Sequence, residues 1–146
     1  MLYRRQVMKK INLDFDGYWR EINKNSIPSK SGVYCVYSCV YNSSNKTVSL
    51  KKLLYIGESE NVHDRIANHD RLEDWKKELS DNETLCYSFG PIGTGDRVRA
   101  EAAMIFKHKP PMNEEYTNNF PYEDTEMVLT GKTNLLNTNF VVKKSL

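Results

Sequence analysis

The segment from Gly32 to Tyr41 constrains the fold more than any other part of this sequence. Its ten residues, Gly-Val-Tyr-Cys-Val-Tyr-Ser-Cys-Val-Tyr, are mostly β-branched, aromatic or small and apolar. That composition is typical of a strand that is buried over most of its length. A polar turn follows at 42–47 and the apolar pattern resumes at 53–56, which together predict a β-hairpin with a long tip.

Spacing predicts the elements around this hairpin. Apolar and aromatic residues recur at helical intervals in four segments, which are 14–24, 62–69, 72–79 and 96–109. Further strands are predicted at 84–89, 126–129 and 139–142, the last two joined by a turn that contains Gly131. We therefore expect a small α+β domain. It would have a three-stranded antiparallel sheet flanked by helices, an N-terminal helix, and a C-terminal extension that forms a hairpin.

Length and composition limit the classes of protein to which this chain can belong. With 146 residues it has the size of one domain with one core. Its 21 Lys and Arg face 19 Asp and Glu, for a net charge of +2, so any site for a polyanion must be local. The longest apolar runs are far too short to cross a bilayer, so we expect no membrane partner.

The three cysteines, Cys35, Cys39 and Cys86, set the expected compartment. Their number is odd, no Cys-x-x-Cys pair occurs, and the N-terminus lacks an apolar signal segment, so we expect reduced thiols in the cytoplasm. The cysteine and histidine spacing argues against a zinc site. We interpret the cysteines as small buried apolar residues.

Three polar side chains call for an explanation beyond packing. Glu101 lies beside the apolar stripe of its helix, where a carboxylate needs water, a cation or a basic partner; periodicity alone favours a head group that reaches water. Arg65 and His69 are four residues apart and share a helix face. A guanidinium can hold a phosphate and an imidazole can accept a proton, but an ordinary solvated surface is the alternative for this pair.

Five short elements, in order along the chain, resemble the signature of the GIY-YIG nucleases. Gly32-Val33-Tyr34 and Tyr55-Ile56-Gly57 look like its two halves, and the second half matches letter for letter. The family's Arg, Glu and Asn match Arg65, Glu101 and Asn113, the last after a proline turn. Because each element falls on a fitting predicted helix, strand or turn, the resemblance is stronger than any one tripeptide.

The resemblance divides the chain into three parts. These are an N-terminal extension with a short helix at 1–30, a GIY-YIG-like catalytic domain at 31–115, and a C-terminal extension at 116–146 packed on the same domain. Within the first part, Arg4, Arg5, Lys9 and Lys10 have no neighbouring carboxylate, which favours a flexible leader over a phosphate-contacting arm.

His69 places the chain nearest to the branch of the family that includes certain restriction and homing endonucleases, and two features depart from the family pattern. Twenty residues, 35–54, separate the motif tyrosines, which we interpret as a lengthened hairpin. Glu58 stands where many members have a Lys soon after the second motif, so a supporting positive charge is missing there.

The resemblance implies a metal-dependent endonuclease that hydrolyses DNA phosphodiester bonds. One divalent ion, Mg²⁺ or Mn²⁺, would be held by Glu101, because Mg²⁺ is commonly bound through one carboxylate, waters and a substrate phosphate. Tyr34 would be the general base and Tyr55 a second phenol beside it. The remaining roles are a phosphate clamp, a proton acceptor and an orienting amide, assigned to Arg65, His69 and Asn113 respectively.

Two alternatives to an active nuclease stay open. Glu58 and the near-neutral charge fit a DNA-binding module that kept the fold and lost turnover. A protein-interaction domain would use the tail at 122–146 as its contact. Dimerisation would permit double-strand cuts at a symmetric site, and the sequence does not decide between a monomer and a homodimer.

Overall fold

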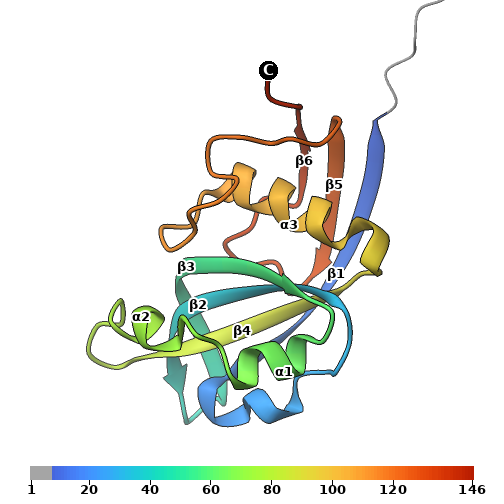
Figure 1. Ribbon diagram of the computed structural model, residues 1–146. Coiled ribbons are helices and arrows are strands. Elements are labelled where there is room, and N and C mark those ends of the chain that lie inside the picture. Colours follow the sequence, from blue (N-terminus) through green and yellow to red (C-terminus); the bar gives the residue numbers. More distant parts are fainter. Residues whose placement is uncertain (1–7) are drawn as a thin grey trace, which may run out of the picture.

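A six-stranded mixed sheet forms the body of the protein, as the computed structural model in Figure 1 shows for residues 8–146. Its strands are β1 (Lys9–Arg20), β2 (Gly32–Asn42), β3 (Thr47–Ser59), β4 (Glu83–Pro91), β5 (Thr125–Gly131) and β6 (Asn139–Val142). Their order across the sheet is β3-β2-β4-β1-β5-β6. The helical segments are the 3-10 turn η1 (Glu21–Ser26), α1 (Val62–Ala67), α2 (Leu72–Lys76) and α3 (Thr94–His108).

The predicted fold class, an α+β domain with a three-stranded antiparallel sheet between helices, is wrong. The predicted strands β2, β3 and β4 are present, but β1, β5 and β6 extend the same sheet to six strands, and β1 pairs with β5 in parallel. The sheet curls strongly, and most of the helices beside it are short (Figure 1). The predicted C-terminal hairpin is confirmed by the antiparallel pairing of β5 with β6.

The predicted N-terminal helix at 14–24 is mostly strand. Ile11, Leu13 and Phe15 are buried and alternate with exposed residues, which is the period of a strand with one face in the core. Backbone pairing with β4 on one side and β5 on the other overrides the helical spacing of the later aromatic residues. Helical structure begins only at Glu21, as a short 3-10 turn.

The basic leader is also corrected in part. Lys9 and Lys10 belong to β1, and Lys9 forms an ion pair with Asp96 at 2.9 Å, so these two residues are not a flexible leader. Arg4 and Arg5 lie outside the described residues. No helix in 8–146 has the length and apolar character needed to cross a membrane.

The two faces of β2 enter two separate clusters of buried side chains. Odd-numbered residues such as Val33 and Tyr37 join the larger one, here called the α3 cluster, which also holds Leu13, Phe15 and the inner face of α3. Even-numbered residues, Tyr34 and Val36, join the α1–α2 cluster; its other members are Ile27, Leu54, Val62, Ile66, Trp75, Leu85, Tyr87 and Phe89. The alternation of a strand thus sends neighbouring residues into different surroundings.

The expectation of reduced thiols fails for two of the three cysteines. Cys39 on β2 and Cys86 on β4 form a disulfide, with their Cα atoms 6.3 Å apart, whereas Cys35 is a free, buried thiol. The pairing of Cys39 with Thr84 and of Tyr37 with Cys86 sets the two cysteines diagonally on adjacent strands. That neighbourhood arises from tertiary pairing, so cysteine number and spacing could not reveal it.

Candidate active site

The six predicted site residues come from six different segments of the chain. Tyr34 lies on β2, Tyr55 on β3, Arg65 on α1, His69 between α1 and α2, Glu101 on α3 and Asn113 in the loop after α3. The ring of Tyr55 lies between two groups of them. Its centroid is 6.4 Å from that of Tyr34 and 5.7 Å from that of His69, and it lines one small pocket together with Glu101 and Asn113.

Glycine at position 57 makes room for Tyr34. The two residues are paired across β2 and β3, and a Cβ atom built on Gly57 would overlap the phenol ring and hydroxyl of Tyr34. The phenol therefore lies directly against the backbone of the second motif. This contact gives a packing reason for the glycine in Tyr55-Ile56-Gly57.

A buried hydrogen bond joins Tyr34 to His69. The Oη atom of Tyr34 is 2.8 Å from Nε2 of His69, and the two residues are 1% and 5% exposed. Burial, with the help of Tyr55, raises the pKa of Tyr34 well above its usual value, while the charge of Arg65 opposes that shift. Burial and the charge of Arg65 lower the pKa of His69 to about 4, so the imidazole is neutral at pH 7.

The protonated nitrogen of His69 follows from its second hydrogen bond. Nδ1 accepts the backbone N–H of Arg71 at 3.0 Å, which requires an unprotonated Nδ1. The proton of the neutral ring is therefore assigned to Nε2, which donates to the oxygen of Tyr34. Donation to that oxygen favours the phenolate form of Tyr34.

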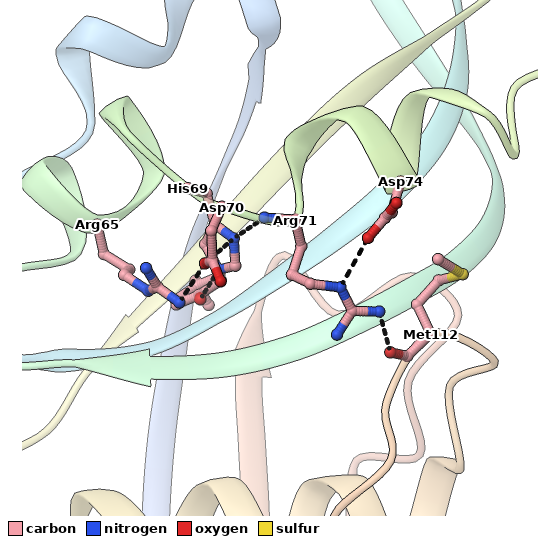
Figure 2. Close-up of polar contacts among 7 residues, drawn as sticks. Arg65, His69, Asp70, Arg71, Asp74 and Met112 are labelled. Atoms are coloured by element: carbon pink, nitrogen blue, oxygen red, sulfur yellow. Dashed lines mark hydrogen bonds and ion pairs between the residues drawn. The ribbon is translucent and has the colours of Figure 1, made fainter.

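Arg65 lies at the mouth of this arrangement. Its Nη2 donates to Oδ1 of Asp70 at 2.9 Å (Figure 2). Both side chains are exposed to solvent. An exposed ion pair of this kind contributes little to stability, so the guanidinium can exchange Asp70 for a phosphate at little cost.

Glu101 sits among other carboxylates in the pocket that Tyr55 also lines. Burial first, and then the negative charges of Glu58 and Glu115, raise the pKa of Glu101 to about 8. Its charge is close enough to contribute to the raised pKa values of Tyr55 and Tyr34. Glu58, which stands where the GIY-YIG resemblance would lead one to expect a Lys, is ion-paired with Arg97.

These surroundings fit a single hard cation beside Glu101. Within residues 8–146 there is no group of three or more His, Cys, Asp or Glu side chains arranged to hold a metal. A site here would therefore depend on Glu101, water and a substrate phosphate, which is a donor set that Mg²⁺ accepts. A divalent charge would also restore the ionised form of this carboxyl.

Asn113 holds the loop after α3 against the edge of the sheet. Its Oδ1 accepts the backbone N–H of Ile56 and its Nδ2 donates to the carbonyl of the same residue, both at 2.9 Å. The N–H of Met112 bonds the carbonyl of Leu54 at 3.0 Å, so the loop continues the pairing of edge strand β3. Both polar atoms of the Asn113 side chain thus form hydrogen bonds with the backbone of Ile56.

Arg71 belongs to the site and was missed by the sequence analysis. Its guanidinium donates to Oδ2 of Asp74 at 3.2 Å and to the carbonyl of Met112 at 3.0 Å (Figure 2). It lies 5.6 Å from the centroid of the Tyr55 ring and lines the same pocket as Glu101. In the sequence it is half of an ordinary i,i+3 ion pair with Asp74, a pattern that does not distinguish a site residue from a helix surface.

The pocket between Tyr55 and Glu101 measures about 120 Å³. That volume accommodates a few water molecules and is well below the size of a nucleotide site.

No family model, curated protein or solved structure matches this chain. The resemblance to the GIY-YIG signature thus stays a prediction from the motifs. The geometry of the described residues is the independent ground on which a function can be argued.

Proposed function

We propose that this chain is a metal-dependent endonuclease that hydrolyses DNA phosphodiester bonds, as the GIY-YIG resemblance implies. The observation that carries the proposal is the convergence around Tyr55. The rings of Tyr34 and His69 lie beside that of Tyr55, and Tyr55 lines one pocket with Glu101 and Asn113, although the sheet as a whole is not the predicted one. Packing requirements alone do not call for two phenols, two guanidiniums, an imidazole and a carboxylate in one place.

Tyr34 is the proposed general base for the attacking water. Its ionisation is opposed by burial, and two neighbours favour it: the cation of Arg65 and the N–H of His69. In this proposal His69 acts as a hydrogen-bond donor to a Tyr34 phenolate, in place of the proton acceptor that we predicted from the sequence. The proton of the water would pass to the phenolate oxygen.

Arg65 and Arg71 lie on the phosphate side of the proposed reaction. Arg65 would release Asp70 and bind the non-bridging oxygens, which offsets the charge that builds up in the transition state. Arg71 supplies a second cation beside Tyr55. It would take the role of the Lys that the resemblance leads one to expect where this chain has Glu58. Mg²⁺ or Mn²⁺ bound at Glu101 would supply Lewis-acid stabilisation of the leaving 3′ oxygen.

The cytoplasmic location was inferred from the N-terminus and the cysteine pattern. The Cys39–Cys86 disulfide argues against the second of these grounds, since such bonds are rare in that compartment. The proposed reaction does not depend on the compartment.

The test is cleavage of supercoiled plasmid with Mg²⁺, with EDTA as the blank. We expect Tyr34→Phe and Glu101→Gln each to slow cleavage by about 100-fold or more, the usual scale for a lost base or metal ligand. Tyr37→Phe is the matched control, because it removes a buried hydroxyl from the same strand on the opposite face. Cleavage that survives both site substitutions, or that falls equally with Tyr37→Phe, would exclude this site as the catalytic centre.

A DNA-binding module without turnover is the second candidate. The observation that favours it is the burial of Tyr34, which is 1% exposed and has a raised pKa, since a base must reach its water. This candidate predicts DNA binding that weakens steeply with salt and no Mg²⁺-dependent product. The wild-type plasmid assay separates it from the nuclease.

A further inference from the structure

A second concave surface lies outside the candidate active site. It is a groove of about 530 Å³, here called the basic groove, and shares no lining residue with the pocket at Glu101. Its walls come from the end of β1, the tip of the β2–β3 hairpin and the β5–β6 connection. The lining residues that matter here are Tyr18, Arg20, Tyr41, Lys46, Lys132 and Asn134.

All the charged side chains that line the basic groove are positive. Arg20, Lys46 and Lys132 are its charged lining residues, and no Asp or Glu lines it. Within residues 8–146 none of these three cations takes part in an ion pair. A neighbouring groove of about 650 Å³ shares Lys132 with the basic groove and differs from it because Asp14 and Asp16 also line it.

The side chain of Arg20 and the loop that carries Lys132 are anchored by contacts other than ion pairs. The guanidinium of Arg20 lies 3.6 Å from the centroid of the Tyr41 ring, a cation–π contact that fixes its plane and leaves its charge intact. The backbone N–H of Lys132 bonds the carbonyl of Phe15 at 2.8 Å. The N–H of Asn134 bonds the hydroxyl of Tyr18 at 3.1 Å, so the loop that carries Lys132 is anchored to β1.

The candidate active site needs such a surface. Its pocket is lined by Glu101, Glu114 and Glu115 against the single cation of Arg71, so it repels a polyanion until a metal binds. The whole chain has a net charge of only +2 and cannot attract DNA through bulk charge. Affinity for a phosphate backbone must therefore come from a local group of unpaired cations.

We propose that the basic groove binds the phosphodiester backbone of DNA and supplies most of the chain's affinity for it. Three cations around a groove the size of a nucleotide match a short stretch of successive phosphates. The stacked Arg20 presents its in-plane N–H donors to a phosphate, a geometry that a free lysine lacks. The choice of DNA as the polyanion rests on the proposed function.

The test is fluorescence anisotropy of a labelled 20-base-pair duplex in EDTA, so that binding is measured without cleavage. The triple variant Arg20→Gln, Lys46→Gln, Lys132→Gln should raise Kd at least about tenfold, and the slope of log K against log salt should fall by about 2 to 3. The control triple variant Lys10→Gln, Lys51→Gln, Lys77→Gln removes the same charge from exposed positions outside the groove. It should change Kd by less than about twofold.

Unchanged DNA affinity in the groove variant, or an equal loss in both triple variants, would overturn the proposal, provided that circular dichroism shows both variants folded. Plasmid cleavage separates this failure from failure of the nuclease. If the groove variant cuts with an unchanged KM, the basic groove is excluded and the nuclease stands. If wild type binds DNA through the groove and never cuts it, the proposed nuclease activity is wrong and the proposed role of the basic groove holds.

Discussion

The two faces of β2 have different roles. On the face toward α3, Val33, Cys35 and Tyr37 enter a large apolar cluster that joins β1, β5, β6 and α3. On the face toward α1 and α2, Tyr34 meets His69 in a buried polar pair next to Trp75. One strand thus contributes alternate residues to stability and to the candidate chemistry, so substitutions at neighbouring positions should have separable effects.

The largest effect on stability should come from the α3 cluster. Leu13 is 1% exposed and packs there from β1, so Leu13→Ala should lower the free energy of unfolding by about 2–5 kcal/mol. Cleavage per folded molecule should stay unchanged, because the cavity opens away from Tyr34. Urea unfolding measures the first quantity and plasmid cleavage the second, with exposed Asn12→Ala as the control. A matching loss of cleavage in the folded fraction would show that the two faces are coupled.

Gly57→Ala should lower both stability and cleavage, because its Cβ would overlap the phenol of Tyr34. We expect a loss of about 1–3 kcal/mol from overpacking, together with loss of cleavage as the phenol is displaced from His69. Gly95→Ala is the control, since a Cβ there meets no atom within 4 Å. Wild-type cleavage by Gly57→Ala would argue that the position of Tyr34 does not matter for the reaction.

Glu101→Gln should change stability with the opposite sign. The folded-state pKa of about 8 lies above the ordinary value of 4.5, so between these two pH values the unfolded chain loses a proton that the fold retains, and the wild type loses stability. The variant lacks this loss, so its free energy of unfolding relative to wild type should rise by up to about 3 kcal/mol between pH 5 and pH 8.

Adding Mg²⁺ to the comparison of wild type with Glu101→Gln tests the proposed cation site. It should raise the unfolding temperature of wild type at pH 8 and leave Glu101→Gln unchanged, because a cation that binds the native site stabilises the fold by mass action. Thermal unfolding with and without Mg²⁺ measures this independently of cleavage. An equal shift in both proteins would place the cation elsewhere.

The sequence predicted local features better than long-range ones. β2 could be predicted because its composition is unambiguous, and the start of α1 because helical spacing begins at Val62, where the side chain of Asn61 accepts the N–H of Asp64 and caps the helix. The segment at 14–24 was assigned to a helix because its aromatic residues fit that period, whereas the alternation that begins at Ile11 decided the outcome. The parallel partner of β1 lies more than a hundred residues away in the chain, and no local pattern reports it.

Features of the candidate site also differ in whether the sequence could predict them. A motif fixes the order of Tyr34, Tyr55 and Glu101 in the chain; in the structure Tyr34 lies beside Tyr55, and Tyr55 lines one pocket with Glu101, while their catalytic roles stay a prediction. The tautomer of His69 could not be predicted, since it depends on the conformation of a turn in which the N–H of Arg71 meets Nδ1. The position of Arg71 could not be predicted either, since its guanidinium bonds the carbonyl of Met112 in the loop after α3. Motifs specify which groups are present, whereas tertiary contacts specify their protonation and direction.

The position of β1 between β4 and β5 has a consequence for biosynthesis. The strand made first is the one onto which the strands made last must dock, so half of its hydrogen-bonding edge has no partner until β5 emerges from the ribosome. During that interval the nascent chain exposes an edge capable of pairing with another chain. A chain that terminates before Thr125 would keep this edge permanently open, and aggregation would be its expected fate.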